Sequence, residues 1–132
     1  MSHAKEIGRI GEEMVAKFLR SKGYIIFARN HHEKYGELDI VAENPEIMLF
    51  VEVKTRKADS ILAPADAVDY DKERKIINTA RIFVKKAHHF GPVRFDIAEV
   101  TYTIDTLGDY HFSLNYIKNA FSADEPITEQ SF

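Results

Sequence analysis

The chain contains no cysteine, which excludes disulfides, thiolate nucleophiles and cysteine metal ligands. This absence fits a reducing cytosol, and we expect a cytoplasmic protein. The apolar run at residues 47–51 has the size of a strand and is far shorter than the ~20 residues of a membrane-spanning helix. The N-terminus lacks the basic and then apolar segments of a secretory signal peptide. We therefore expect no contact with a membrane.

Several signatures of catalysis and binding are also missing. The sequence has no glycine-rich phosphate loop, no Ser/His/Asp constellation and no aromatic RNA-binding signature. The histidine pairs at residues 31–32 and 88–89 lack the spacing of a zinc site, and we expect all four on the surface. These absences narrow the range of functions to consider.

Composition and charge describe one ordinary domain with an uneven distribution of charge. A chain of 132 residues, 45% hydrophobic and 30% charged, is long enough for a single core. The net charge of −3 weighs mildly against nucleic-acid binding. Residues 95–132 carry −6, however, while residues 1–94 carry +3, so the body of the domain is moderately basic. The charge therefore permits a nucleic-acid partner without demonstrating one.

Hydrophobic periodicity predicts an α/β domain. We expect helices at residues 2–23 and 65–88 and strands at residues 24–29, 37–43, 46–54, 93–102 and 110–117. A polar turn at 30–35 and an irregular basic loop at 55–64 would connect them. The order predicts a mixed central sheet flanked by helices, with the 46–54 strand central and Gly23 and Gly91-Pro92 as helix stops. Residues 1–118 would form the single domain, and residues 119–132 an acidic, flexible tail.

Three charged residues interrupt the predicted hairpin where hydrophobic residues belong. Asp39 lies within one strand, and period-2 alternation places Glu52 and Lys54 on one face of the next. If the acidic faces coincide, each carboxylate raises the pKa of the other unless a cation lies between them. Oxygen ligands favour Mg²⁺ or Mn²⁺, and the Val53 carbonyl would supply a third oxygen. The alternative is that Lys54 merely neutralises both acids at a solvated end of the sheet.

The first helix adds a third acid. Helical periodicity places Glu12 at the border of the buried stripe, close to Gly8 and Gly11. A glycine inside a helix costs about 0.5–1 kcal/mol relative to alanine, so we expect these two to allow close approach to the sheet. The alternative is that Glu12 is a boundary acid paired with Lys5 or Arg9.

The second helix carries a lysine in an apolar row. Lys72 shares an i, i+4, i+3 row with hydrophobic residues, namely Val68, Ile76, Ala80 and Phe83. A lysine in such a row either extends along the surface to reach water or contacts a phosphate or carboxylate. The sequence leaves both possibilities open.

These residues together resemble a known superfamily. Asp39, followed thirteen residues later by Glu52-Val53-Lys54, matches the Asp…Glu-x-Lys signature of the PD-(D/E)-x-K nucleases, with Leu38 in place of the leading proline. The wider set resembles the YraN-like family, described as predicted endonucleases similar to archaeal Holliday junction resolvases. That set comprises Gly11-Glu12, Arg29-Asn30, Gly36-Glu37-Leu38-Asp39, residues 50–56 and Arg94-Phe95-Asp96. The resemblance runs from about residue 4 to residue 117.

The resemblance implies a restriction-endonuclease-like fold and metal-dependent hydrolysis of phosphodiester bonds. Asp39, Glu52 and the Val53 carbonyl would hold Mg²⁺ or Mn²⁺. Lys54 would be the catalytic lysine, which polarises the attacking water, and Glu12 would orient that water.

The resemblance also implies a substrate. Arg56, Lys57 and Lys72 would contact neighbouring phosphates, and we expect DNA rather than RNA, recognised by its shape. Asp96 matches a stretch to which the resemblance gives no role. The sequence departs from the family pattern at residues 57–62, where members tend to have a loop with serine and glycine. Because resolvase-like enzymes act as symmetric dimers, the resemblance also allows a homodimer.

Two other classes of function stay open at this stage. The chain could be a non-catalytic nucleic-acid-binding module that retains the nuclease fold, or an adaptor in which the charged cluster is structural. Cleavage in the presence of Mg²⁺, salt-dependent binding without products, or neither result would distinguish the three classes.

Overall fold

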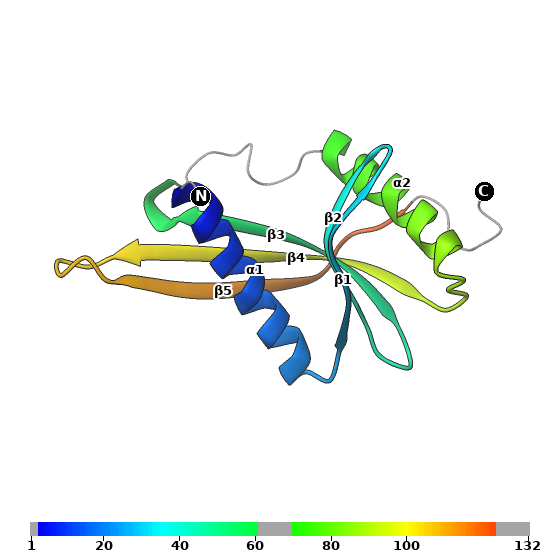
Figure 1. Ribbon diagram of the computed structural model, residues 1–132, viewed down its shortest axis with the longest axis horizontal. Helices are drawn as coiled ribbons and strands as arrows, with labels where there is room; N and C mark the ends of the chain where they lie inside the picture. Colours follow the sequence, from blue (N-terminus) through cyan, green and yellow to red (C-terminus); the bar gives the residue numbers. More distant parts are fainter. Residues whose placement is uncertain (1–2, 61–69, 124–132) are drawn as a thin grey trace.

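Five strands form one mixed sheet in the computed structural model, which describes residues 3–60 and 70–123 (Figure 1). The strands are β1 (Ile25–Glu33), β2 (Gly36–Glu43), β3 (Met48–Lys57), β4 (Val93–Ile104) and β5 (Tyr110–Phe121). They lie side by side in chain order, with β3 and β4 parallel and the other neighbours antiparallel. The helices are α1 (His3–Ser21) and α2 (Tyr70–Lys86), and a 3₁₀ turn, η1 (Ala58–Ser60), follows β3. The predicted α/β architecture is confirmed.

The two helices cover opposite faces of the sheet because side chains alternate along its central strand. Met48 and Phe50 pack towards α2, whereas Leu49 and Val51 pack towards α1. All four side chains are at most 2% exposed. Cover on both faces explains why β3 is apolar without alternation until Glu52, as the sequence predicted for a central strand.

Both helices end in a residue with left-handed backbone conformation. Gly23 has a φ of 92°, and the N–H of Tyr24 donates to the carbonyl of Leu19, so the predicted stop at Gly23 is confirmed. His88 plays the same part after α2 with a φ of 51°, so the prediction that Gly91-Pro92 ends this helix was wrong. Residues 65–69 of the predicted helix lie outside the described residues. Neither described helix is long and apolar enough to cross a membrane.

Four strands continue beyond their predicted ends, and β4 does so as far as Ile104. β1 continues to Glu33, so the polar turn shrinks to residues 34–35, and β3 continues to Lys57 where an irregular loop was expected. β5 runs to Phe121 and includes the first residues assigned to the tail, of which residues 124–132 lie outside the described residues. In each case the added residues pair with a neighbouring strand, and hydrophobic periodicity does not register such backbone pairing.

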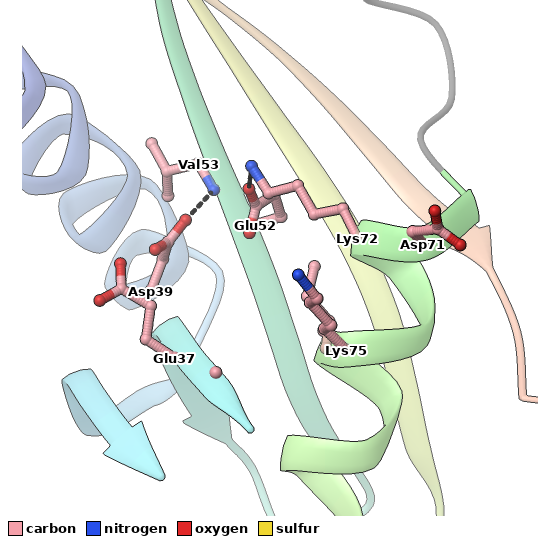
Figure 2. Close-up of a pocket in the computed structure, with 9 residues that line it drawn as sticks. Glu37, Asp39, Glu52, Val53, Asp71, Lys72 and Lys75 are labelled. Carbon is pink, nitrogen blue, oxygen red and sulfur yellow. Dashed lines mark hydrogen bonds and ion pairs between the residues drawn. The ribbon is translucent and has the colours of Figure 1, made fainter. Parts of the chain in front are cut away.

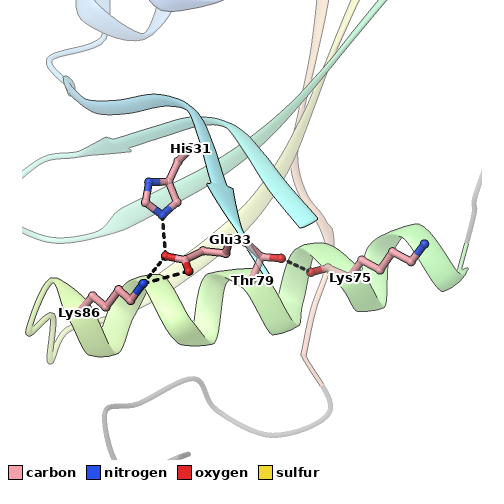
Figure 3. Close-up of polar contacts among 5 residues, drawn as sticks. All are labelled: His31, Glu33, Lys75, Thr79 and Lys86. Atoms are coloured by element: carbon pink, nitrogen blue, oxygen red, sulfur yellow. Dashed lines mark hydrogen bonds and ion pairs between the residues drawn. The ribbon is translucent and has the colours of Figure 1, made fainter. Parts of the chain in front are cut away.

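The tip of the β1–β2 hairpin is held against α2 (Figure 3). The Lys86 ammonium donates to both oxygens of Glu33, at 2.9 and 3.0 Å, and His31 contacts the same carboxylate at 2.9 Å. His31 also lies edge-on against Phe83 with ring centroids 5.0 Å apart, so the expectation that it is a surface residue was wrong. Its side chain is 30% exposed. These contacts fix one wall of the site described next.

Candidate functional site

The site begins where β2 separates from β3. Backbone pairing of the two strands ends at Ile40 and Val51. Beyond that point the N–H of Val53 donates to Oδ2 of Asp39 at 2.9 Å. The carboxylate thus takes the place of a main-chain carbonyl of β2 as the acceptor. Leu38 packs in the α2-facing cluster rather than with Ile40, so the strict alternation predicted for β2 fails here. The opening therefore comes from the sheet itself.

Two carboxylates, Asp39 of β2 and Glu52 of β3, lie at this opening, and the charge of a third, Glu12 of α1, reaches Asp39. Glu52 is buried, with 8% exposure, and its charge and side-chain hydrogen bond both raise the pKa of Asp39. Burial, then the charge of Glu52 and lastly that of Glu12 raise the pKa of Asp39 from 3.8 to about 7, although the Val53 hydrogen bond opposes them. The sequence prediction that these acids are neighbours thus agrees with the structure. Burial and the neighbouring acids therefore oppose the ionisation of Asp39.

Glu12 reaches the opening from α1 because this helix lies close to β3. A Cβ on Gly11 would overlap the hydroxyl of Thr55, whereas Gly8 has open space around it. The prediction that glycine permits close approach is therefore confirmed for Gly11 and wrong for Gly8. Glu12 Oε1 is buried without a hydrogen-bond partner among the described residues, while Arg9 forms an ion pair with Glu6 at 3.6 Å. An unsatisfied buried carboxylate oxygen is costly and suits a site that awaits a donor.

Two lysines predicted for the site lie on different elements, and one of them, Lys72, contacts an acid. β3 alternation places Lys54 on the α2-facing side, two residues after Glu52, and its side chain is partly buried. From α2, the Lys72 ammonium lies 2.5 Å from Glu52 Oε1. Burial by itself would lower the pKa of Lys72. The hydrogen bond and the charge of Glu52 together outweigh this effect, so the pKa of Lys72 is raised. Of the two possibilities left open for Lys72, contact with a carboxylate is the one observed.

A pocket of about 570 Å³ lies between the β1–β2 hairpin and α2 (Figure 2). Asp39 and Glu52 form one side of it, and Lys72 and Lys75 extend across it from α2. The complete lining is Gly36, Glu37, Asp39, Glu52, Val53, Asp71, Lys72, Lys75 and Ile76. Asp39, Glu52 and Lys72 thus share one cavity that is open to solvent, whereas Glu12 and Lys54 are not part of its lining.

The donor set can be compared with what a divalent cation requires. Within residues 3–60 and 70–123, no three carboxylate or imidazole side chains are grouped as a metal site would need. Asp39 and Glu52 supply hard oxygen donors, and the Val53 carbonyl points to the same strand edge as its N–H, towards Asp39. With the repulsion at Asp39, these donors fit Mg²⁺ or Mn²⁺ if water completes the coordination.

The remaining predicted basic residues lie outside the pocket lining. Arg56 and Lys57 belong to the last part of β3, opposite Thr101 and Tyr102 of β4. The charge of Arg56 nevertheless lowers the pKa of Lys72, so Arg56 lies within electrostatic range of the site. Lys57 is 4.0 Å from Asp59. Arg56 and Lys57 extend the positive charge along β3 beyond the acids.

Asp96, which the resemblance left without a role, is a structural residue. It is fully buried, and Arg94 donates to both of its oxygens, at 2.8 and 2.9 Å. The Tyr116 hydroxyl and the Asn119 N–H also donate to it, at 2.6 and 2.8 Å. Asn119 has a φ of 51° where the β4–β5 register shifts. The carboxylate thus secures an irregularity in β5.

Sequence reasoning missed three charged residues of the pocket. Glu37, Asp71 and Lys75 all line it. Glu37 shares the alternation of Asp39, and Lys75 lies three residues after Lys72, so both spacings were visible in the sequence. What the sequence did not show was that α2 lies over this end of β2.

Comparison with known proteins identifies the family. The model of the uncharacterised protein family UPF0102 matches residues 11–100. A UPF0102 protein from Dictyoglomus turgidum is 38% identical over 118 residues, which cover 89% of this chain and 98% of the relative. UPF0102 proteins from Clostridium botulinum and Clostridium perfringens are each 40% identical over 119 residues, covering 89% of this chain and 94% of each relative. The match spans α1 to β4 and includes every residue of the site, and the chain belongs to the UPF0102 family.

Proposed function

We propose that the protein is a metal-dependent nuclease that hydrolyses phosphodiester bonds, with DNA as the substrate. The observation that carries this proposal is the pair Asp39 and Glu52 at the point where β2 leaves β3, with Glu12 within electrostatic range of Asp39. Glu52 and Glu12 raise the pKa of Asp39, and Glu12 Oε1 is buried without a hydrogen-bond partner among the described residues. A structural role alone does not account for this arrangement. The same acids stand at the positions of the nuclease signature.

Each residue of the site has a chemical role in this proposal. Asp39, Glu52 and the Val53 carbonyl would hold Mg²⁺ or Mn²⁺, which when bound supplies positive charge against a phosphate oxygen. Lys54 orients the attacking water and stabilises the negative charge that develops as it loses its proton. Glu12 accepts a hydrogen bond from that water through Oε1, which has no other partner among the described residues.

Lys72 keeps Glu52 in place. Its ammonium holds one oxygen of Glu52 and leaves the rest of the carboxylate to face Asp39. Removing this amine would leave Glu52 buried without its ion pair, which is costly. Lys72 is therefore a positioning residue in this proposal, and not primarily a contact to substrate.

The proposal also covers the kind of nuclease and the kind of DNA on which it acts. The ordered motifs of the sequence resemble the YraN-like predicted endonucleases and, more distantly, archaeal Holliday junction resolvases. We propose selectivity for DNA structure, because neither the signature nor the pocket offers an evident set of base-reading side chains. Action in the cytoplasm and a homodimer complete the proposal, and analytical ultracentrifugation of the full chain tests the dimer.

The test is cleavage of labelled single-stranded and branched DNA with Mg²⁺, Mn²⁺ or EDTA. Asp39→Asn and Lys54→Ala are expected to lower the rate by at least about 100-fold, since each removes a direct contribution to the chemical step. Glu46→Gln is the matched control, because Glu46 is exposed in the β2–β3 turn. Equal residual cleavage by wild type and both site variants would indicate a contaminating nuclease and remove the proposal.

One observation favours a second candidate, a nucleic-acid-binding module without turnover. Lys72 already neutralises Glu52, as a bound cation would, so the site retains part of its balance without metal. Such a module would bind DNA in a salt-dependent manner and give no products with any divalent ion. The cleavage assay above therefore separates the two candidates.

A further inference from the structure

Lys75 is a cation in the pocket with no assigned part in the chemistry. Its side chain is exposed and lines the cavity beside Asp39 and Glu52. Its main-chain carbonyl accepts the Thr79 hydroxyl at 2.7 Å, but no described residue forms an ion pair or hydrogen bond with its ammonium. In Figure 2 the ammonium lies on the pocket side of α2, as that of Lys72 does, and in Figure 3 the side chain runs along α2 towards the N-terminal end of the helix.

The backbone of Lys75 is fixed where α2 meets the hairpin. A Cβ on Gly36 would lie 3.1 Å from Thr79 Oγ1 and 3.9 Å from the Lys75 Cβ, so the hairpin turn is packed directly on the helix. Further along α2, the Lys86–Glu33 contact closes the same interface (Figure 3). The distance of Lys75 from the acids is therefore set by packed elements and not by a free loop.

The balance of charge in the pocket makes Lys75 the lysine that is suited to bind an incoming anion. The lining contains four acids, Glu37, Asp39, Glu52 and Asp71, and two lysines. Lys72 is engaged with Glu52, so its charge is already compensated. With one divalent cation at the acids, the formal charge of the lining would be zero, and a phosphate could enter without net repulsion. The exposed ammonium of Lys75 would then be the nearest positive group for a second phosphate.

We propose that Lys75 binds the phosphate next to the one that is cleaved, on a nucleic-acid strand that runs along α2. This inference rests on the proposed function and assigns the two lysines different tasks. Lys72 and Lys75 are three residues apart, about 4.5 Å along the helix axis. Because Lys72 holds Glu52 beside the phosphate that is cleaved, Lys75 would lie about one phosphate further along the strand, since phosphates advance about 3.4 Å each along one stacked strand. Lys72 positions Glu52, and Lys75 holds the substrate.

The experiment measures binding separately from cleavage. Fluorescence anisotropy with a labelled single-stranded oligodeoxynucleotide is recorded in Ca²⁺ at several salt concentrations. Lys75→Ala is expected to weaken binding about 5- to 10-fold at low salt and to reduce the slope of log K against log salt by about 0.7, the value for one phosphate contact. Lys75→Arg should restore both. Lys17→Ala removes the same charge from the exposed side of α1, across the sheet, and should change neither.

Steady-state cleavage in Mg²⁺ completes the test. Lys75→Ala should raise KM with little change in kcat, whereas Lys72→Ala should lower kcat. If wild type cleaves DNA and Lys75→Ala keeps the wild-type salt slope and KM, the inference fails and the proposed function stands. If wild type binds with a slope that depends on Lys75 but never cleaves, the nuclease proposal fails and the phosphate contact stands. Absence of binding by wild type would overturn both.

Discussion

Two aspartates of this molecule, one buried and one half-buried, have opposite surroundings. Asp96 receives four hydrogen bonds, two of them from Arg94, and is completely enclosed between β4 and β5. Asp39 receives one main-chain hydrogen bond, from Val53, and is subject to the charges of Glu52 and Glu12. A buried charge is tolerated when donors satisfy it, and it is costly when other acids surround it. The first arrangement stabilises a fold, and the second is characteristic of a functional site.

The two regions also differ in which group has a raised pKa. Burial and the hydrogen bond to Asp96 raise the pKa of Tyr116, so this hydroxyl stays protonated and continues to donate. Near Asp39, the pKa of the carboxyl itself is raised to about 7. The Tyr116 hydroxyl therefore keeps its proton at neutral pH, whereas the raised pKa of Asp39 lets that carboxyl change its charge near pH 7.

The largest effect should come from Asp96→Asn. The substitution removes the charge that faces Arg94 and replaces one acceptor oxygen by a donor, so the cost should be about 3–5 kcal/mol in the free energy of unfolding. Urea denaturation followed by circular dichroism measures it. Tyr116→Phe is the graded control and should cost about 1 kcal/mol, because it removes one of the four bonds. A loss below about 1 kcal/mol for Asp96→Asn would remove the contrast between the two aspartates.

The approach of α1 to the site should depend on Gly11 alone of the two helix glycines. Gly11→Ala is expected to cost about 2 kcal/mol, because its methyl group overlaps Thr55. Gly8→Ala should instead stabilise the protein by about 0.5–1 kcal/mol, since its surroundings are open and alanine favours the helix. Thermal melting of both variants makes the comparison. Equal effects would mean that close packing of α1 does not place Glu12.

The pH dependence of stability should identify Asp39. Its pKa is raised in the native state, so between about pH 4 and pH 7 the native state binds more protons than the unfolded state. The free energy of unfolding should thus fall as pH rises through this window, by about 1–2 kcal/mol for a partly exposed group. Denaturation is measured in EDTA. Asp39→Asn should flatten this part of the curve and be at least as stable as wild type at pH 7.

The smallest effect should be stabilisation by Mg²⁺. A cation that binds the native state alone adds about 1.4 kcal/mol at ten times its Kd, so the melting temperature of wild type should rise. Asp39→Asn and Glu52→Gln should abolish the increase, whereas Asp96→Asn should retain it in spite of its lower starting stability. A Mg²⁺ response that survives Asp39→Asn would place the cation elsewhere.

Much of the site was predictable because period-2 alternation is a local rule. The spacing of Glu52 and Lys54 fixes them on one face of β3, and helical periodicity fixes Glu12 at the edge of the buried stripe. Lys75 was not predicted, because its importance depends on which part of α2 lies over the hairpin. Asp96 could not be interpreted either, since two of its four hydrogen bonds come from Tyr116 and from Asn119, which lies in an irregularity of β5.

The predicted ends of several strands and of α2 were wrong for a related reason. Polar residues such as His31 and Arg56 lie in strands because neighbouring strands satisfy their backbone groups, which composition does not reveal. His88 ended α2 in a left-handed conformation, for which histidine gives only a weak signal.

The sequence by itself determined the order of elements, the central position of β3 and the presence of acids where a hairpin should be apolar. It did so because the side-chain periods of helix and strand depend on neighbouring residues only. The tertiary structure alone decided that β2 leaves β3 at Asp39, that Lys72 pairs with Glu52 and that Asp96 is satisfied. Those outcomes depend on charges and donors brought together from distant parts of the chain, and their energies exist only once the sheet and both helices have packed.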